Sequence, residues 1–193
     1  MTRKEQLEKL NNKMSLCSKC TLHCNASRIV AGDGNPEAAI MFIGEAPGKK
    51  EDELGIPFVG STGRILDKML LETKLKREDV YLTNICKCRP PENRDPLAEE
   101  MEECLPWLEK QIEIINPKLI VTLGRYALNC FLPKVKISEI HGEIQESFIK
   151  GIGKTTLFPL HHPAAARINR KTRAIFEEDF KKIPNLLRQI KKD

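Results

Sequence analysis

The chain has 193 residues, of which 40% are hydrophobic and 31% charged, and its net charge is +5. This composition is typical of one soluble globular domain, and we expect a single domain over residues 1–193. No apolar run reaches the roughly 18 residues of a membrane span, and the N-terminus does not resemble a signal peptide. A cytoplasmic or nucleoid-associated monomer is expected, without membrane contact and with a slight preference for anionic partners.

Apolar runs and helical patterns alternate along the chain. A helix is predicted over 3–14, where Leu7, Leu10 and Met14 share one face, and a cysteine-rich loop follows over 15–28. Four short apolar runs predict buried strands at 39–43, 80–83, 119–123 and 156–160. Helical patterns lie at about 62–74, 97–115, 124–131 and 173–191. One interpretation of segment 132–155 is an additional strand pair, with 141–147 as one arm.

This alternation favours an α/β fold with a parallel sheet and helices on both faces. Ligands of such sheets bind beyond the carboxyl ends of the strands. The segment that follows each predicted strand is therefore expected at one common rim. These four segments are 44–63, 84–94, 124–127 and 161–169.

Seven cysteines are many for a cytoplasmic chain, in which disulfides are rare, so metal or cluster ligation is favoured. Cys17 and Cys20 form a C-x2-C pair, and Cys88 and Cys104 offer a distant second pair with 15 residues between them. Spacing does not separate zinc from a [4Fe–4S] cluster, although the uneven spacing suits a cluster slightly better. Cys24 competes with the first pair. Cys86 is not counted among the ligands, because two residues apart on an extended chain it would face away from Cys88. Cys130 is not counted either, because it is expected in the core.

The loop 44–63 does not have the composition of a phosphate cradle. It carries Glu45 and further acidic residues, and Pro47 has no N–H to donate. A pocket for a neutral, planar, hydrogen-bonding ligand is more consistent with it. Phe58 would supply a ring for stacking from an exposed rim position, and Glu45 would act as an acceptor or orient a water.

The fourth rim segment places two adjacent histidines, His161 and His162, near the same pocket. A neutral imidazole can donate a hydrogen bond to a developing oxyanion. Basic residues follow within a few positions and predict a patch that binds phosphates on either side of a base. They are Arg167, Arg170, Lys171 and Arg173.

Several motifs in this order resemble the iron–sulfur uracil-DNA glycosylases, called family 4, of the uracil-DNA glycosylase superfamily. The motifs are "GEAPG" with "GIPFVG" (44–60), "TNICKCRPPENRDP" (83–96), Cys104, "VTLGRYAL" (121–128) and "HPAAA" (162–166). The resemblance implies a three-layer α/β/α sandwich around a four-stranded parallel sheet. It also implies a [4Fe–4S] cluster on Cys17, Cys20, Cys88 and Cys104, and uracil-containing DNA, single- or double-stranded, as the partner.

The resemblance further implies hydrolysis of the N-glycosidic bond of deoxyuridine after the base has left the stack, in base excision repair. Asn84 matches the asparagine that reads uracil, and Phe58 the ring that stacks on it. Glu51 matches the position suspected of excluding the thymine methyl group, and His162 the histidine that donates to O2 of the leaving base. Gly44, Glu45 and Ala46 belong to the first motif, and Glu45 or the adjacent backbone would position the water.

Contacts with DNA are expected from four further residues. Ala166 and Arg167 are candidates for the residue that wedges into the duplex, and the cluster loop adds Arg89 and Arg94. Two alternatives remain at this point. One is a glycosylase for another deaminated base, hypoxanthine or xanthine, and the other is a non-catalytic iron–sulfur protein that binds nucleic acid.

Overall fold

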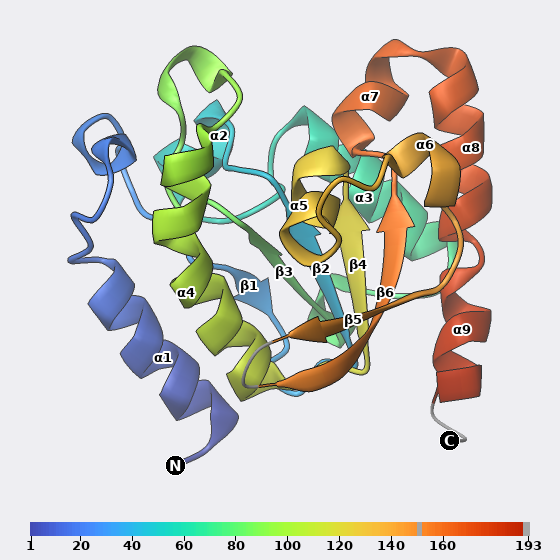
Figure 1. Ribbon diagram of the computed structural model, residues 1–193, viewed down its shortest axis with the longest axis horizontal. Coiled ribbons are helices and arrows are strands. Elements are labelled where there is room, and N and C mark those ends of the chain that lie inside the picture. Colours follow the sequence, from blue (N-terminus) through green and yellow to red (C-terminus); the bar gives the residue numbers. More distant parts are fainter. Residues whose placement is uncertain (150–151, 191–193) are drawn as a thin grey trace.

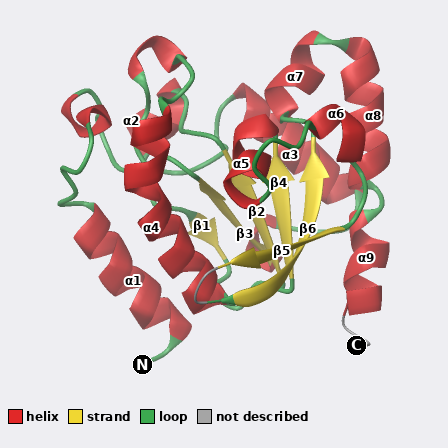
Figure 2. Cartoon of the chain, in the orientation of Figure 1, coloured by secondary structure: helices red, strands yellow, loops and turns green. Residues whose placement is uncertain are grey.

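The computed structural model describes residues 1–149 and 152–190 (Figures 1 and 2). The strands are β1 (Asp33–Gly34), β2 (Ile40–Gly44), β3 (Val80–Asn84), β4 (Leu119–Leu123), β5 (Gln145–Ile149) and β6 (Gly153–Leu160). The helices are α1 (Arg3–Met14), α2 (Lys49–Leu54), α3 (Ser61–Glu72), α4 (Ala98–Ile115), α5 (Arg125–Phe131), α6 (Ile137–Ile140), α7 (Pro163–Ile168), α8 (Arg170–Phe180) and α9 (Ile183–Ile190). Short 3-10 turns lie at Thr21–Cys24, Arg77–Asp79 and Pro91–Asn93.

The described strands form one mixed sheet in the order β1-β3-β2-β4-β6-β5. The four predicted strands are its parallel centre, β3-β2-β4-β6. The α/β class is confirmed, but the expected total of four strands is wrong because an antiparallel strand is added at each edge. β1 has only two residues and no apolar pattern, whereas β5 lies in the segment 132–155 for which a strand pair was one interpretation.

The sheet separates two hydrophobic cores, as its alternating side chains require. In β2, Ile40 and Phe42 face a core that contains the apolar faces of α3, α8 and α9. Met41 and Ile43 face the opposite core, which α1 and α4 cover. The same alternation continues through the other central strands, so the expected three layers are present (Figure 1).

Most helix predictions match to within one or two residues, but the C-terminal one is wrong. Residues 173–191 were expected to form one helix, whereas α8 ends at Phe180 and α9 begins at Ile183, with residue 191 outside the described part. Pro184 explains the break, since it has no N–H to donate to the carbonyl of Phe180. No helix in the described ranges is long and apolar enough to cross a membrane.

Candidate active site

The carboxyl ends of β2, β3 and β6 open into a cavity of about 320 Å³, here called the rim cavity. This volume is within the range of small-molecule sites. Three of the four predicted rim segments line it directly. The remaining segment, 124–127, does not line the cavity but lies beside it, because a Cβ on Gly124 would lie 3.0 Å from the Cβ of His162. The lining residues are Glu45, Ala46, Pro47, Gly48, Glu51, Phe58, Thr62, Asn84, Pro90, Asn93, Arg94, Asp95, His162 and Ala164.

Asn84 is the last residue of β3 and has only 2% of its surface exposed. Its amide forms no hydrogen bond with another residue of the described part, so it is free to bind a ligand in the rim cavity. Gly44, its register partner on β2, makes the space for it. A Cβ on Gly44 would lie 2.4 Å from Oδ1 of Asn84 and 2.8 Å from Cζ of Phe58.

Phe58 is buried, with 4% of its surface exposed, so the expected exposed rim position is wrong. Its ring packs in the core and still forms one wall of the rim cavity. The backbone is held at a φ of 53°, a region that bulky residues rarely occupy. Arg77 stabilises this turn by donating to the carbonyls of Pro57 and Phe58. Backbone outliers of this kind cluster at active sites and ligand-binding sites.

Two buried acids of the first loop are held by backbone N–H groups. Glu51 Oε1 accepts hydrogen bonds from Val59 and Gly60 over 3.0 and 2.8 Å, at the N-terminus of α3. Asp52 Oδ1 accepts from Ser27 over 2.9 Å and so ties α2 to the cysteine-rich loop. Glu51 also lines the rim cavity, where its carboxylate narrows the space beside Gly48.

Glu45 is an acid of the same loop whose pKa is raised by its surroundings. Burial raises the pKa of its carboxyl to about 7, the Asp95 carboxylate adds to the rise, and the Arg125 guanidinium opposes it. Asp95 is itself held by Arg125 over 2.8 Å and by the Tyr126 hydroxyl over 2.5 Å. A carboxyl with a pKa near 7 can take up a proton at neutral pH, as a general base must.

His162 lines the rim cavity at the start of α7, and its protonation is defined by a backbone contact. The Ala164 N–H donates to Nδ1 over 3.1 Å, so the proton of the neutral ring is on Nε2. Burial lowers the pKa of this imidazole to about 4. The ring is therefore neutral at physiological pH and can donate one hydrogen bond from Nε2.

His161 belongs to a different group of side chains from His162. Its ring packs against that of His141, with the centroids 4.8 Å apart. His141 Nδ1 lies 2.7 Å from Asp179, which also binds Lys182. Of the two histidines, only His162 is among the residues that line the rim cavity.

The four residues expected to contact DNA differ in accessibility. Ala166 is fully buried in the core, so its side chain is not free to enter a duplex, whereas Arg167 is exposed. Arg94 lines the rim cavity but forms two hydrogen bonds with Glu100, over 2.8 and 2.6 Å. Arg89 is half-buried and donates to Asn93. Sequence reasoning missed Ile168, an apolar residue that is 79% exposed at the end of α7.

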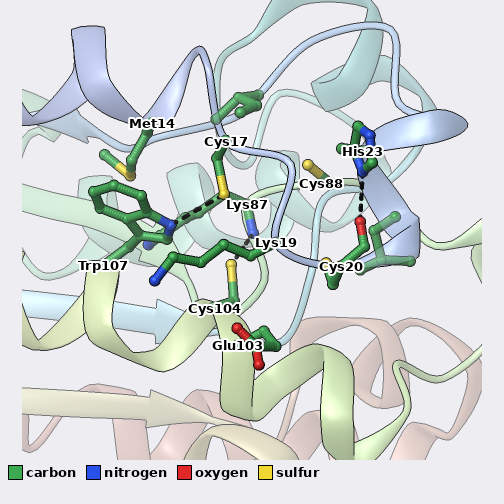
Figure 3. A pocket seen from close by; sticks show the side chains of 12 residues that line it. Met14, Cys17, Lys19, Cys20, His23, Lys87, Cys88, Glu103, Cys104 and Trp107 are labelled. Carbon is green, nitrogen blue, oxygen red and sulfur yellow. Dashed lines mark hydrogen bonds between the residues drawn. The ribbon is translucent and has the colours of Figure 1, made fainter.

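The four cysteines expected to bind a cluster all line another pocket, here called the cysteine pocket (Figure 3). Cys17 and Cys20 come from the loop after α1, Cys88 from the segment after β3, and Cys104 from α4. Cys24 is exposed, Cys86 is buried, and neither lines this pocket. Within residues 1–149 and 152–190, no three His, Cys, Asp or Glu side chains form a group that could hold a single metal ion.

Two N–H groups point at the sulfur atoms of the cysteine pocket. The indole Nε1 of Trp107 donates to Cys17 Sγ over 3.4 Å, and the backbone N–H of Lys87 donates to Cys104 Sγ over 3.2 Å (Figure 3). N–H···S bonds of this kind surround thiolates that hold iron–sulfur clusters. The donor set and its surroundings therefore fit a cluster with four thiolate ligands.

Comparison with known proteins gives the same family as the motifs. The model of the uracil DNA glycosylase superfamily matches residues 31–188. A type-4 uracil-DNA glycosylase from Sulfurisphaera tokodaii is 45% identical, over 94% of this chain and 85% of its own. One from Archaeoglobus fulgidus is 44% identical, over 94% of both chains. One from Thermotoga maritima is 41% identical, over 97% of this chain and 98% of its own.

The matched region contains the strand ends that form the rim cavity. The relatives cover nearly the whole chain, including the cysteine-rich loop that precedes that region. The chain therefore belongs to the uracil DNA glycosylase superfamily, and within it to the family of the type-4 uracil-DNA glycosylases. The family predicted from the sequence motifs is confirmed.

Proposed function

We propose that this protein, as a single domain over residues 1–193, removes uracil from DNA by hydrolysing the N-glycosidic bond of deoxyuridine. The observation that carries the proposal is the composition of the rim cavity. It combines a free amide on Asn84, a neutral imidazole on His162 and a carboxyl of raised pKa on Glu45. We also propose that it acts as a monomer on chromosomal DNA at the nucleoid.

In the proposed complex, the flipped base lies against the Phe58 ring and its edge faces Asn84. The amide of Asn84 donates to O4 and accepts from N3–H, the edge that distinguishes uracil from cytosine. The carboxylate of Glu51 fills the space beside Gly48 in the rim cavity. In the proposed complex, this leaves little room for the C5 methyl group of thymine. Gly44 and Ala46 leave space for the base because their side chains are small.

The proposed reaction uses one water, and the carboxylate of Glu45 accepts its proton as the water oxygen bonds to C1′. The C1′–N1 bond breaks, and its electron pair leaves with the uracil as an anion. His162 donates from Nε2 to O2 of that anion and so stabilises the leaving group. Solvent then protonates the uracil anion and takes the proton from Glu45, so the products are free uracil and an abasic site.

We further propose that Cys17, Cys20, Cys88 and Cys104 hold a [4Fe–4S] cluster. When bound, the cluster would supply a structural crosslink between segments that lie beside the rim cavity; hydrolysis requires no electron transfer. Arg167 and the neighbouring basic residues of α8 would contact phosphates near the flipped nucleotide. Arg94 contributes mainly to the structure of the cluster loop, because Glu100 occupies its guanidinium.

A single-turnover assay on an end-labelled oligonucleotide with one uracil tests the proposed function. Cleavage by alkali only at uracil, without added metal or nucleotide, is the expected result on single strands and on duplexes. Cleavage only at hypoxanthine or xanthine would support another base preference. Binding to DNA without cleavage of any of these substrates would favour the non-catalytic iron–sulfur protein.

A further inference from the structure

Lys87 is a charged residue with only 2% of its surface exposed, and it lies between the two pockets. It lines the cysteine pocket, and its backbone N–H donates to Cys104 Sγ. Its ammonium group, however, contacts the backbone at the end of β3, and the last residue of this strand, Asn84, lines the rim cavity. Lys87 is not among the described residues that line that cavity.

The ammonium of Lys87 uses all three of its donors within the protein. Nζ lies 2.6 Å from the carbonyl oxygen of Asn84, 2.7 Å from Thr83 Oγ1 and 2.6 Å from Gln111 Oε1. A buried ammonium is costly to desolvate unless its hydrogen bonds are complete. Such a fully bonded cation holds the backbone around it in one geometry.

The acceptors of this ammonium are fixed in turn. Thr83 Oγ1 donates to the Ala31 carbonyl over 2.8 Å, and Gln111 Nε2 donates to the same carbonyl over 2.7 Å. Gln111 belongs to α4, the helix that also carries Cys104. The backbone of Asn84 is therefore held, through Lys87, by Gln111 of α4 and by Ala31, which precedes β1.

We propose that Lys87 is a positioning residue that fixes Asn84 for reading the base and connects it to the segments that carry the cluster cysteines. This inference rests on the proposed function. Lys87 itself touches neither the substrate nor the reacting atoms. Its effect passes through Asn84, because misplacement of a substrate-contacting group by about 1 Å costs roughly 100-fold in rate.

A double-mutant cycle with Lys87→Met and Asn84→Ala tests this proposal. Methionine keeps the length of the side chain and removes its charge and donors. We expect Lys87→Met to lower the single-turnover rate on single-stranded uracil DNA by about 100-fold. In the Asn84→Ala background the same change should lower the rate by less than about threefold, because the residue that Lys87 positions is already gone.

Lys110→Met is the matched control, since Lys110 lies on the surface of α4 and pairs with Glu113 in solvent. It should leave the rate unchanged. The visible absorbance of each variant shows whether the cluster is bound. Equal rate losses in both backgrounds, or no loss from Lys87→Met, would overturn the proposal. If Lys87→Met does not fold, Gln111→Met replaces it in the cycle, because this change removes one acceptor of the ammonium.

Hydrogen exchange provides a readout that does not depend on excision. The N–H groups of Ile85 and Cys86 donate to the carbonyls of Gly44 and Glu45, both over 3.0 Å, and continue the strand pairing beyond Asn84. They should exchange at least about tenfold faster in Lys87→Met than in Lys110→Met. Equal exchange contradicts the positioning role. A wild-type protein that leaves every uracil in place contradicts the proposed function instead, and the exchange result still decides the role of Lys87.

Discussion

Replacement of Glu45 by glutamine should stabilise the protein and impair its activity. The carboxyl has its pKa raised from 4.5 to about 7, so its ionised form is unfavourable in the folded state. A rise of this size is equivalent to at most about 3 kcal/mol. Glu45 is only partly buried, and screening by solvent reduces the expected effect to about 1–2 kcal/mol.

The pH dependence of this stabilisation has a defined sign. Below about pH 4.5, Glu45 is protonated in both the folded and the unfolded state, and the variant gains nothing. The wild-type protein loses stability as the pH rises from that value through about 7, whereas the neutral glutamine does not. Urea unfolding at pH 5 and pH 8 should therefore show a larger gain for the variant at the higher pH. Glu8→Gln, an exposed change on α1, is the control and should show none.

The same carboxyl should control the rate. If Glu45 takes the proton from water, the single-turnover rate of the wild type rises with pH through about 7 and then levels off. Loss of a general base costs about 100- to 10,000-fold, so Glu45→Gln should be slower by this factor and nearly independent of pH. A wild-type rate that is flat between pH 5 and pH 9 would refute the reasoning. So would a variant that keeps the same rise with pH.

Three further predictions concern the other side chains of the rim cavity and its mouth. His162→Ala should lower the single-turnover rate by about 100-fold with little change in DNA affinity, since one donor to the leaving group is lost; His161→Ala should stay within a fewfold of the wild type, and the reverse ranking would contradict the assignment. Asn84→Asp should reduce excision of uracil relative to cytosine by about 5- to 150-fold, the equivalent of 1–3 kcal/mol for a mismatched hydrogen bond. Competition between uracil and cytosine substrates measures it, with unchanged visible absorbance as the control for the cluster. Ile168→Ala should slow excision from duplexes but not from single strands, because an apolar wedge offsets the cost of unstacking a base only where the base is paired. The fluorescence of a 2-aminopurine placed beside the uracil reports the flipping step. Equal effects on both substrates would exclude Ile168 as the wedge.

The central fold was predictable because each core strand is a short apolar run that is buried on both faces. The runs at 39–43, 80–83, 119–123 and 156–160 correspond to β2, β3, β4 and the end of β6. The edge strands carry no such signal. β5 alternates between half-buried and exposed residues, with only Ile149 buried, and β1 pairs only through two residues, Asp33 and Gly34.

The members of the rim cavity were predictable to a similar degree, because parallel strands end at one edge of the sheet. The burial of individual side chains in this region was not predictable from the sequence. The ring of Phe58 is turned inward by a backbone conformation with positive φ, and Ala166 faces the core on the inner side of α7. Neither feature has a local sequence signal, since both depend on which elements pack against the segment. The role of Lys87 was equally hidden, because a lysine beside cysteines is normally expected in solvent.

The acidic residues of the first loop now have separate explanations. Glu51 and Asp52 are buried and accept hydrogen bonds from backbone N–H groups, which compensate their charge. Glu53 is exposed near Lys49. Glu45 differs from all of them, because it is partly buried and no hydrogen bond to its carboxylate is present in the described residues. An acid without such compensation retains a high pKa and therefore its capacity to accept a proton at neutral pH. The same absence of partners that makes Glu45 destabilising would make it the reactive carboxylate in the proposed reaction.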